Sequence, residues 1–98
     1  MKIRILAAAA RDLTKAMDYY ESQSEGLGHD FLDEYEKTIL RICRFPEAWA
    51  CVTSHLRRCL MRRFPFAVYY TVIDEQIVIT AIADLRMDPD SIRELIFR

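Results

Sequence analysis

The sequence has few of the residues that mark unusual classes of protein. Its 98 residues include two glycines and three prolines, while 52% are hydrophobic, which excludes an intrinsically disordered chain. The longest apolar run near the start spans six residues, from Ile5 to Ala10, and is too short for a signal peptide or a membrane span. We therefore expect one cytoplasmic domain covering residues 1–98, with no membrane partner.

Cysteine is also scarce, and its three copies form no CxxC pair. An odd number of cysteines fits reduced thiols better than a disulfide framework. Cys51, His55 and Cys59 are spaced four apart and would share one face of a helix or strand, as zinc ligands do. No fourth ligand is evident nearby, so we expect small buried thiols, no metal and no cofactor.

Signatures of catalysis are missing as well. The sequence has no GxSxG motif and no glycine-rich phosphate loop, and neither of its two histidines has an evident catalytic companion. A metal-independent ribonuclease needs only an acid or base and cations that stabilise charge on the phosphate. The candidates for those roles are His55, Arg58, Arg62 and Arg86, and beyond these the catalytic residues are unknown.

Apolar spacing predicts two helices. One stripe of apolar residues indicates a helix from Ala8 to Ser22, and a second stripe indicates another from Gly28 to Arg44. Gly26 between them suits a left-handed turn. Because the connection is short, the two helices should form an antiparallel hairpin.

The remaining segments predict strands and a short terminal helix. The expected strands are Lys2 to Leu6, Leu56 to Arg63, Phe66 to Ile73 and Ile77 to Ala83. A helix should begin after Asp88, with Ile92, Leu95 and Ile96 on its apolar face. The predicted class is α+β: a strand, a helical hairpin on one face of a mostly antiparallel sheet, a three-stranded antiparallel meander and a short C-terminal helix.

The net charge of -1 hides two segments of opposite sign. Eight acids and one base lie between Asp12 and Glu36, whereas four arginines and no acid lie between His55 and Pro65. Such a basic segment suits phosphates or an acidic protein partner. It could equally pair with the acidic helices of the same chain. The four residues are Arg57, Arg58, Arg62 and Arg63.

From Ala7 to Ile92 the chain resembles the RelE/ParE superfamily of toxins from bacterial type II toxin–antitoxin systems. The most specific parts are the Arg-Phe-Pro-Phe sequence at residues 63–66, which enters the long strand, and the Arg-x-Asp-Pro sequence at residues 86–89. The resemblance implies the same succession of strand, helical hairpin and three strands. It also implies a cognate antitoxin that folds as it wraps the toxin.

Within that superfamily the sequence is more similar to the ParE branch, which inhibits DNA gyrase and has no established hydrolytic site. The RelE branch cleaves messenger RNA in the ribosome and uses a lysine- and arginine-rich sheet and a C-terminal tyrosine. Here no lysine follows Lys37 and no tyrosine follows Tyr70. We therefore expect a toxin that acts on gyrase rather than an enzyme, with RelE-type cleavage of messenger RNA as its activity if it is one.

Two alternatives stay open, a RelE-like endoribonuclease and an inactive or non-toxic binding module. The second is suggested by Asp84, Met87 and Ile92, which stand where many relatives carry histidine, arginine and tryptophan. The partners expected are an antitoxin and either gyrase or the ribosome as target, with a homodimer among the assemblies left open. The candidates for binding the target or antitoxin are Arg57, Arg58, Arg62, Arg63, Arg86 and Asp88.

Overall fold

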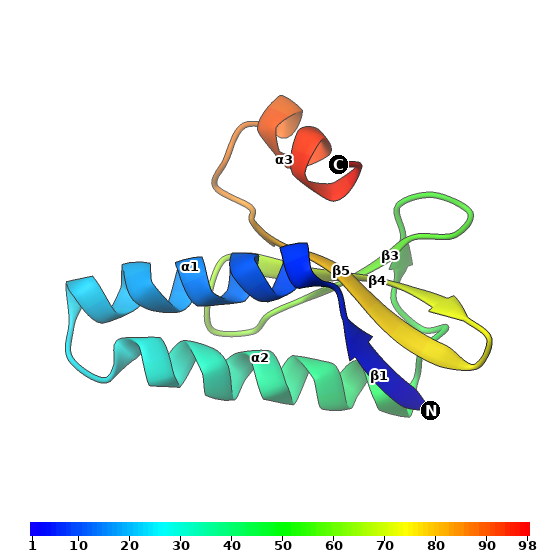
Figure 1. Cartoon of the computed structure of the whole chain (residues 1–98), viewed down its shortest axis with the longest axis horizontal. Coiled ribbons are helices and arrows are strands. Elements are labelled where there is room, and N and C mark those ends of the chain that lie inside the picture. Colours follow the sequence, from blue (N-terminus) through cyan, green and yellow to red (C-terminus); the bar gives the residue numbers. More distant parts are fainter.

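A computed structural model describes all 98 residues as three helices packed on a five-stranded sheet (Figure 1). The helices are α1 (Ala7–Gln23), α2 (Leu27–Arg44) and α3 (Pro89–Ile96). The strands are β1 (Lys2–Ile5), β2 (Ala50–Cys51), β3 (Arg57–Leu60), β4 (Phe66–Ile73) and β5 (Gln76–Asp84). This is the predicted α+β class, and no helix has both the length and the apolar character needed to cross a bilayer.

The sheet is mixed rather than wholly antiparallel. Its strands lie in the order β1-β5-β4-β3-β2, and β1 runs parallel to β5 while the other pairs are antiparallel. The sequence did not predict β2, whose Ala50 and Cys51 pair with Arg58 and Arg57. A strand of two residues is too short to show an alternating pattern.

β3 ends at Leu60, so the prediction of a strand extending to Arg63 is wrong at its end. The backbone N–H of Met61 donates to the carbonyl of Phe66 at 2.9 Å, which closes a turn immediately after the strand. The side chains of Met61 and Phe64 are buried in the core. Because both side chains are directed into the core, residues 61–65 turn instead of continuing β3.

α1 and α2 form the predicted hairpin, and Gly26 has the predicted left-handed conformation with φ of +87°. It lies at the N-cap of α2. The carboxylate of Glu21 in α1 accepts hydrogen bonds from the backbone N–H groups of Gly26 and Gly28, each at 3.0 Å. The end of α1 therefore caps the start of α2, whose first N–H groups have no partner within the helix.

Gly28 is buried where the two helices meet, and a Cβ at this position would lie 2.6 Å from the backbone oxygen of Met17. Alanine in place of glycine usually stabilises a helix by about 1 kcal/mol. Here we expect the opposite sign, because Gly28→Ala must push α1 and α2 apart at a cost of about 1–3 kcal/mol in the free energy of unfolding. Chemical denaturation measures the change in the free energy of unfolding. The control is His29→Ala, a substitution at the neighbouring exposed position. A Gly28→Ala protein more stable than the parent would contradict the close helix contact.

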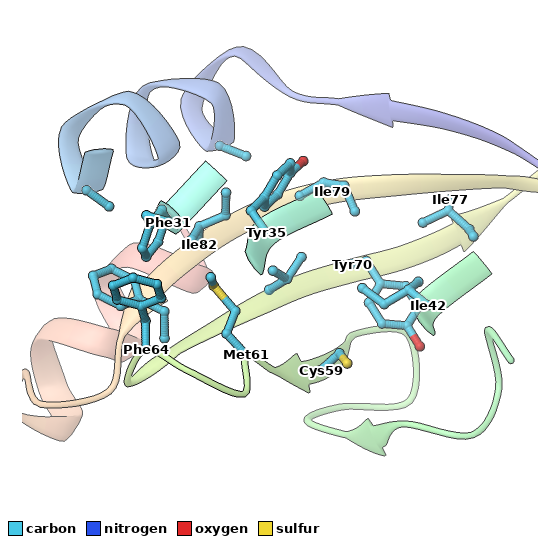
Figure 2. Packing of buried hydrophobic residues seen from close by; sticks show 14 of the residues in the cluster. Phe31, Tyr35, Ile42, Cys59, Met61, Phe64, Tyr70, Ile77, Ile79 and Ile82 are labelled. Carbon is cyan, nitrogen blue, oxygen red and sulfur yellow. The ribbon is translucent and has the colours of Figure 1, made fainter. Parts of the chain in front are cut away.

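The main core lies between the sheet and the helices α1 and α2, as Figure 2 shows. Phe31 of α2 is fully buried at its centre. Its ring centroid lies 5.5 Å from that of Tyr20, 5.0 Å from that of Phe64 and 4.9 Å from that of Phe66. This aromatic cluster joins α1, α2 and the start of β4.

α3 covers the opposite face of the sheet, above the strands in Figure 1. Its predicted apolar face, Ile92, Leu95 and Ile96, packs on a second buried cluster. That cluster consists largely of small side chains, which let the helix approach closely: Leu56, Ala67, Tyr69, Ala81 and Ala83. Because both faces are covered, β4 and β5 have an almost continuous hydrophobic sequence.

Asp12 of α1 accepts a backbone hydrogen bond along the edge of β5, beyond the point where β1 ends. The last residue of β1 pairs with Ile79, so the following backbone groups of β5 have no neighbouring strand on that side. The Asp12 carboxylate accepts from the N–H of Ile82 at 3.0 Å and pairs with the Arg98 guanidinium at 2.7 Å. Arg98 also donates to the carbonyl of Thr80 at 3.2 Å. These contacts satisfy backbone groups along this edge of β5 and hold Arg98 against α1.

Candidate functional site

The four arginines of the basic segment lie in different settings. Arg57 and Arg58 are neighbours on β3, so their side chains point to opposite faces of the sheet. Arg62 and Arg63 lie in the turn between β3 and β4. The segment is therefore not one continuous surface.

Two of these arginines are held within the chain. Arg63 pairs with Asp30 of α2 at 3.2 Å, and its guanidinium lies 5.5 Å from the ring centroid of Phe64. Arg57 donates from Nη1 to the carbonyls of Glu47 and Trp49 at 2.9 and 2.8 Å. Of the four arginines, only Arg63 forms the predicted pair with an acidic helix.

Arg58 and Arg62 are exposed and form no hydrogen bond or ion pair within the chain. Arg58 lies opposite Tyr69 in the register of β3 and β4, on the face that carries α3. Leu60 lies on the same face and is 52% exposed. Arg62 follows them in the turn after β3. We call Arg58, Leu60 and Arg62 together the arginine surface, a name for two free guanidiniums and the exposed apolar side chain between them in the sequence.

Two further cations that were not predicted from the sequence lie near this edge of the sheet. Arg41 and Arg44 belong to the last turn of α2 and form no ion pair, although Arg41 donates to the carbonyl of Leu60 at 3.0 Å. The sequence pattern that could have identified them is a wider basic segment, since residues 37–73 contain seven bases and one acid, Glu47. Their position at a helix C-terminus also favours positive charge without any ligand.

Arg86 lies at the far end of β5 and is directed toward α1. Its Nε and Nη2 atoms donate to the Asp84 carboxylate at 3.0 and 2.9 Å, and Nη2 lies 3.4 Å from the hydroxyl of Tyr20. The guanidinium is also 5.9 Å from the ring centroid of Tyr19. No contact joins Arg86 to the arginine surface.

The ion pair of Asp84 and Arg86 should make the stability of the fold depend on pH. The hydrogen bond from Arg86 lowers the pKa of Asp84, although partial burial opposes the shift. A lowered folded-state pKa stabilises the fold above the unfolded value of about 4, and this contribution is lost as pH falls through the folded pKa. Asp84→Asn should therefore cost about 0.5–1 kcal/mol at neutral pH and much less under acid. Urea denaturation at the two pH values measures this, and equal stability of variant and parent at neutral pH would contradict it.

Asp88 serves as the predicted N-cap of α3. Its carboxylate accepts from the backbone N–H of Ser91 at 2.9 Å and from the Ser91 hydroxyl at 2.7 Å. These hydrogen bonds lower the pKa of Asp88. The Arg-x-Asp-Pro sequence therefore has a structural explanation in this chain, since its arginine pairs with Asp84 and its aspartate begins a helix.

Cys51, His55 and Cys59 do not gather on one face. The expectation of buried thiols holds for Cys59, which lies in the main core, but is wrong for Cys51, which is exposed on β2. The intervening residues turn the chain between the two strands, which removes the regular spacing. Burial raises the pKa of the Cys59 thiol, and no group of three or more His, Cys, Asp or Glu side chains is placed to hold a metal ion.

His55 lies in the turn between β2 and β3 and is exposed. It lines a small hollow with Arg57 and Tyr70. Tyr70 is buried and donates its hydroxyl to the carbonyl of Pro46 at 2.6 Å. The structure thus brings His55 near Arg57 and Tyr70, not near the arginine surface or Arg86.

Comparisons with known proteins agree with this architecture. Residues 3–89 match the family described as the ParE toxin of type II toxin-antitoxin system, parDE. The structure is similar to that of the chromosomal ParDE TA system from P. aeruginosa, with 18% identity, a TM-score of 0.64 and coverage of 87% of this chain and 96% of that chain. It is also similar to the isolated E. coli RelE toxin, with 11% identity, a TM-score of 0.57 and coverage of 95% and 93%. No match was found among curated proteins, and the two structural likenesses indicate a shared fold.

Proposed function

Because the chain belongs to the ParE toxin family of type II toxin–antitoxin systems, we propose that it arrests bacterial growth by acting on DNA gyrase. We also propose that a cognate antitoxin neutralises it. The observation that carries the proposal is the family match over residues 3–89, which includes both helices of the hairpin and every strand but the first residue of β1.

The free cations support an action by binding. Arg58 and Arg62 have no partner in the chain, so their guanidiniums can form charge-assisted hydrogen bonds with carboxylates or phosphates of a target. Leu60 between them adds exposed apolar area. We assign to this arginine surface the contact with gyrase, and to Arg63, Arg86 and Asp88 the structural roles seen in their contacts.

The residues predicted for RelE-like cleavage, His55, Arg58, Arg62 and Arg86, do not form one site, which argues against cleavage by that set. A metal-independent ribonuclease needs a proton donor or acceptor beside the cations that stabilise the transition state. His55 and Tyr70 line a hollow with Arg57, whereas Arg58 points to the opposite face of the sheet. Arg86, the third predicted cation, is held by Asp84 at 2.9 Å.

The antitoxin would neutralise the protein by covering the same surface. A disordered segment that folds on binding can wrap a small domain and present acidic side chains to free arginines. A short reading frame beside this gene, encoding a DNA-binding half and a disordered half, is the expected source of that partner.

Growth experiments test the proposal. Induced expression of the chain alone should arrest growth and switch on the DNA-damage response, and co-expression of the antitoxin should restore growth. Arrest accompanied by ribosome-dependent cutting of messenger RNA, with no DNA-damage response, would support the RelE-like alternative. Harmless expression of the folded chain would overturn the proposal in favour of a non-toxic binding module.

A further inference from the structure

A small polar hollow opens at the edge of the sheet beside the turn between β2 and β3. Its volume is about 160 Å³, and it is lined by Glu47, Ser54, His55, Arg57 and Tyr70 together with the next residues of β4. Sites that take whole small molecules measure roughly 300–1,000 Å³. The hollow therefore has room for one chemical group rather than for an entire cofactor.

Arg57 brings a half-buried positive charge to this hollow without a counter-ion. Its Nη1 atom donates to two backbone carbonyls, but no carboxylate forms an ion pair with it. No buried side-chain nitrogen or oxygen in the chain lacks a hydrogen-bond partner. The remaining donors of Arg57, Nε and Nη2, have no partner in the chain, so they must keep access to solvent. A guanidinium with two adjacent free donors suits a bidentate contact with an oxyanion.

The walls of the hollow are fixed by hydrogen bonds. Tyr70 donates to the carbonyl of Pro46 at 2.6 Å, and burial raises the pKa of Tyr70 to about 12, so its hydroxyl stays neutral. The Oγ1 atom of Thr53 accepts from the backbone N–H groups of His55 and Leu56 at 3.2 and 3.1 Å. This turn places Ser54 and His55 in the lining of the hollow together with Arg57.

We infer that this hollow binds a phosphate monoester group, with Arg57 as its central cation and with Ser54 and His55 as further hydrogen-bond donors. The tetrahedral group offers enough oxygens to contact the guanidinium in a bidentate manner and the two side chains of the turn at the same time. The site lies on the opposite side of β3 from Arg58. The inference therefore does not rest on the proposed action on gyrase, and either can fail without the other.

Glu47 allows a test of whether the group bound in the hollow is negatively charged. It is the one acid lining the hollow, and its exposed carboxylate forms no ion pair. A like charge near a bound phosphate opposes binding. Glu47→Gln should therefore tighten binding by roughly threefold, whereas a purely structural role of this loop would not produce a gain.

Titration of the intact protein with adenosine monophosphate, followed by backbone amide chemical shifts, tests the site directly. We expect saturable shifts in residues 54–57 and 70–72, with a dissociation constant of about 1 mM or below. Inorganic phosphate in a second titration distinguishes a free anion from a nucleotide as the source of the group. Adenosine, which lacks the phosphate, should cause no shifts in these residues. Equal binding of adenosine, or no saturable shift with either phosphate compound, would overturn the inference.

Variants separate this site from general electrostatic attraction. Ser54→Ala and His55→Ala alter exposed side chains of the turn and should each weaken binding by at least about threefold. Arg57→Lys keeps the charge but loses the bidentate geometry and should weaken binding by about tenfold. Arg58→Ala removes a charge from the neighbouring position on the opposite face and should leave binding within about twofold. A loss for Arg58→Ala equal to that for Arg57→Lys would overturn the assigned site.

Discussion

Phe31→Ala is expected to lower the free energy of unfolding by about 3–5 kcal/mol. Phe31 is fully buried and contacts three aromatic rings from α1, the turn after β3 and the start of β4. Its loss leaves a cavity that these rigid rings cannot close. Since domains of this kind are stabilised by about 5–15 kcal/mol, a large share of the stability would disappear. Urea denaturation should show a midpoint lower by at least about 1 M.

Leu40→Ala is the matched control for that experiment. Leu40 lies on the same helix and is 61% exposed, so its truncation should change the free energy of unfolding by less than about 0.5 kcal/mol. Similar losses for the two substitutions would contradict the placement of the aromatic cluster at the centre of the main core.

Charge reversal at the arginine surface should abolish growth arrest without unfolding the protein. Arg58→Glu combined with Arg62→Glu removes two charge-assisted contacts of about 1.5–3 kcal/mol each. The affinity for the target should fall by at least about 100-fold. Because neither side chain has a partner in the chain, the midpoint of urea denaturation should stay close to that of the parent. Survival of cells after induced expression measures the functional loss.

The matched control reverses two exposed cations elsewhere. Arg11 and Lys15 on α1 are exposed and form no ion pair, so Arg11→Glu with Lys15→Glu gives the same change in net charge. This control should still arrest growth. If both double variants were equally harmless, net charge rather than the arginine surface would be responsible, and the assignment of Arg58 and Arg62 would be wrong.

The sequence predicted the regular elements well because their signals are local. β4 from Phe66 to Ile73 has the predicted bounds, and its residues are β-branched or aromatic almost throughout. α3 begins after its Asp88 cap as predicted. β2 was missed because two residues form a strand only by pairing with β3. The position of α3 on the far face was also not predicted, since it depends on alanines of two strands, β4 and β5, meeting in space.

The pairing of charges was not predictable from the sequence for a similar reason. Arg63 and Asp30 are far apart in the chain and meet only when α2 packs beside the turn after β3. Arg86 and Asp84 are close in sequence, yet their pairing depends on how the chain leaves β5. The sequence therefore marked four arginines as equivalent candidates. The fold distinguished Arg58 and Arg62, which are free, from those with internal partners.

The supercoiling assay with purified DNA gyrase tests the central proposal most directly. We predict that the purified protein inhibits supercoiling and causes cleaved DNA to accumulate, and that the protein with Arg58→Glu and Arg62→Glu does neither. Unchanged supercoiling at a large excess of folded protein that still arrests growth in cells would contradict the proposed action on gyrase.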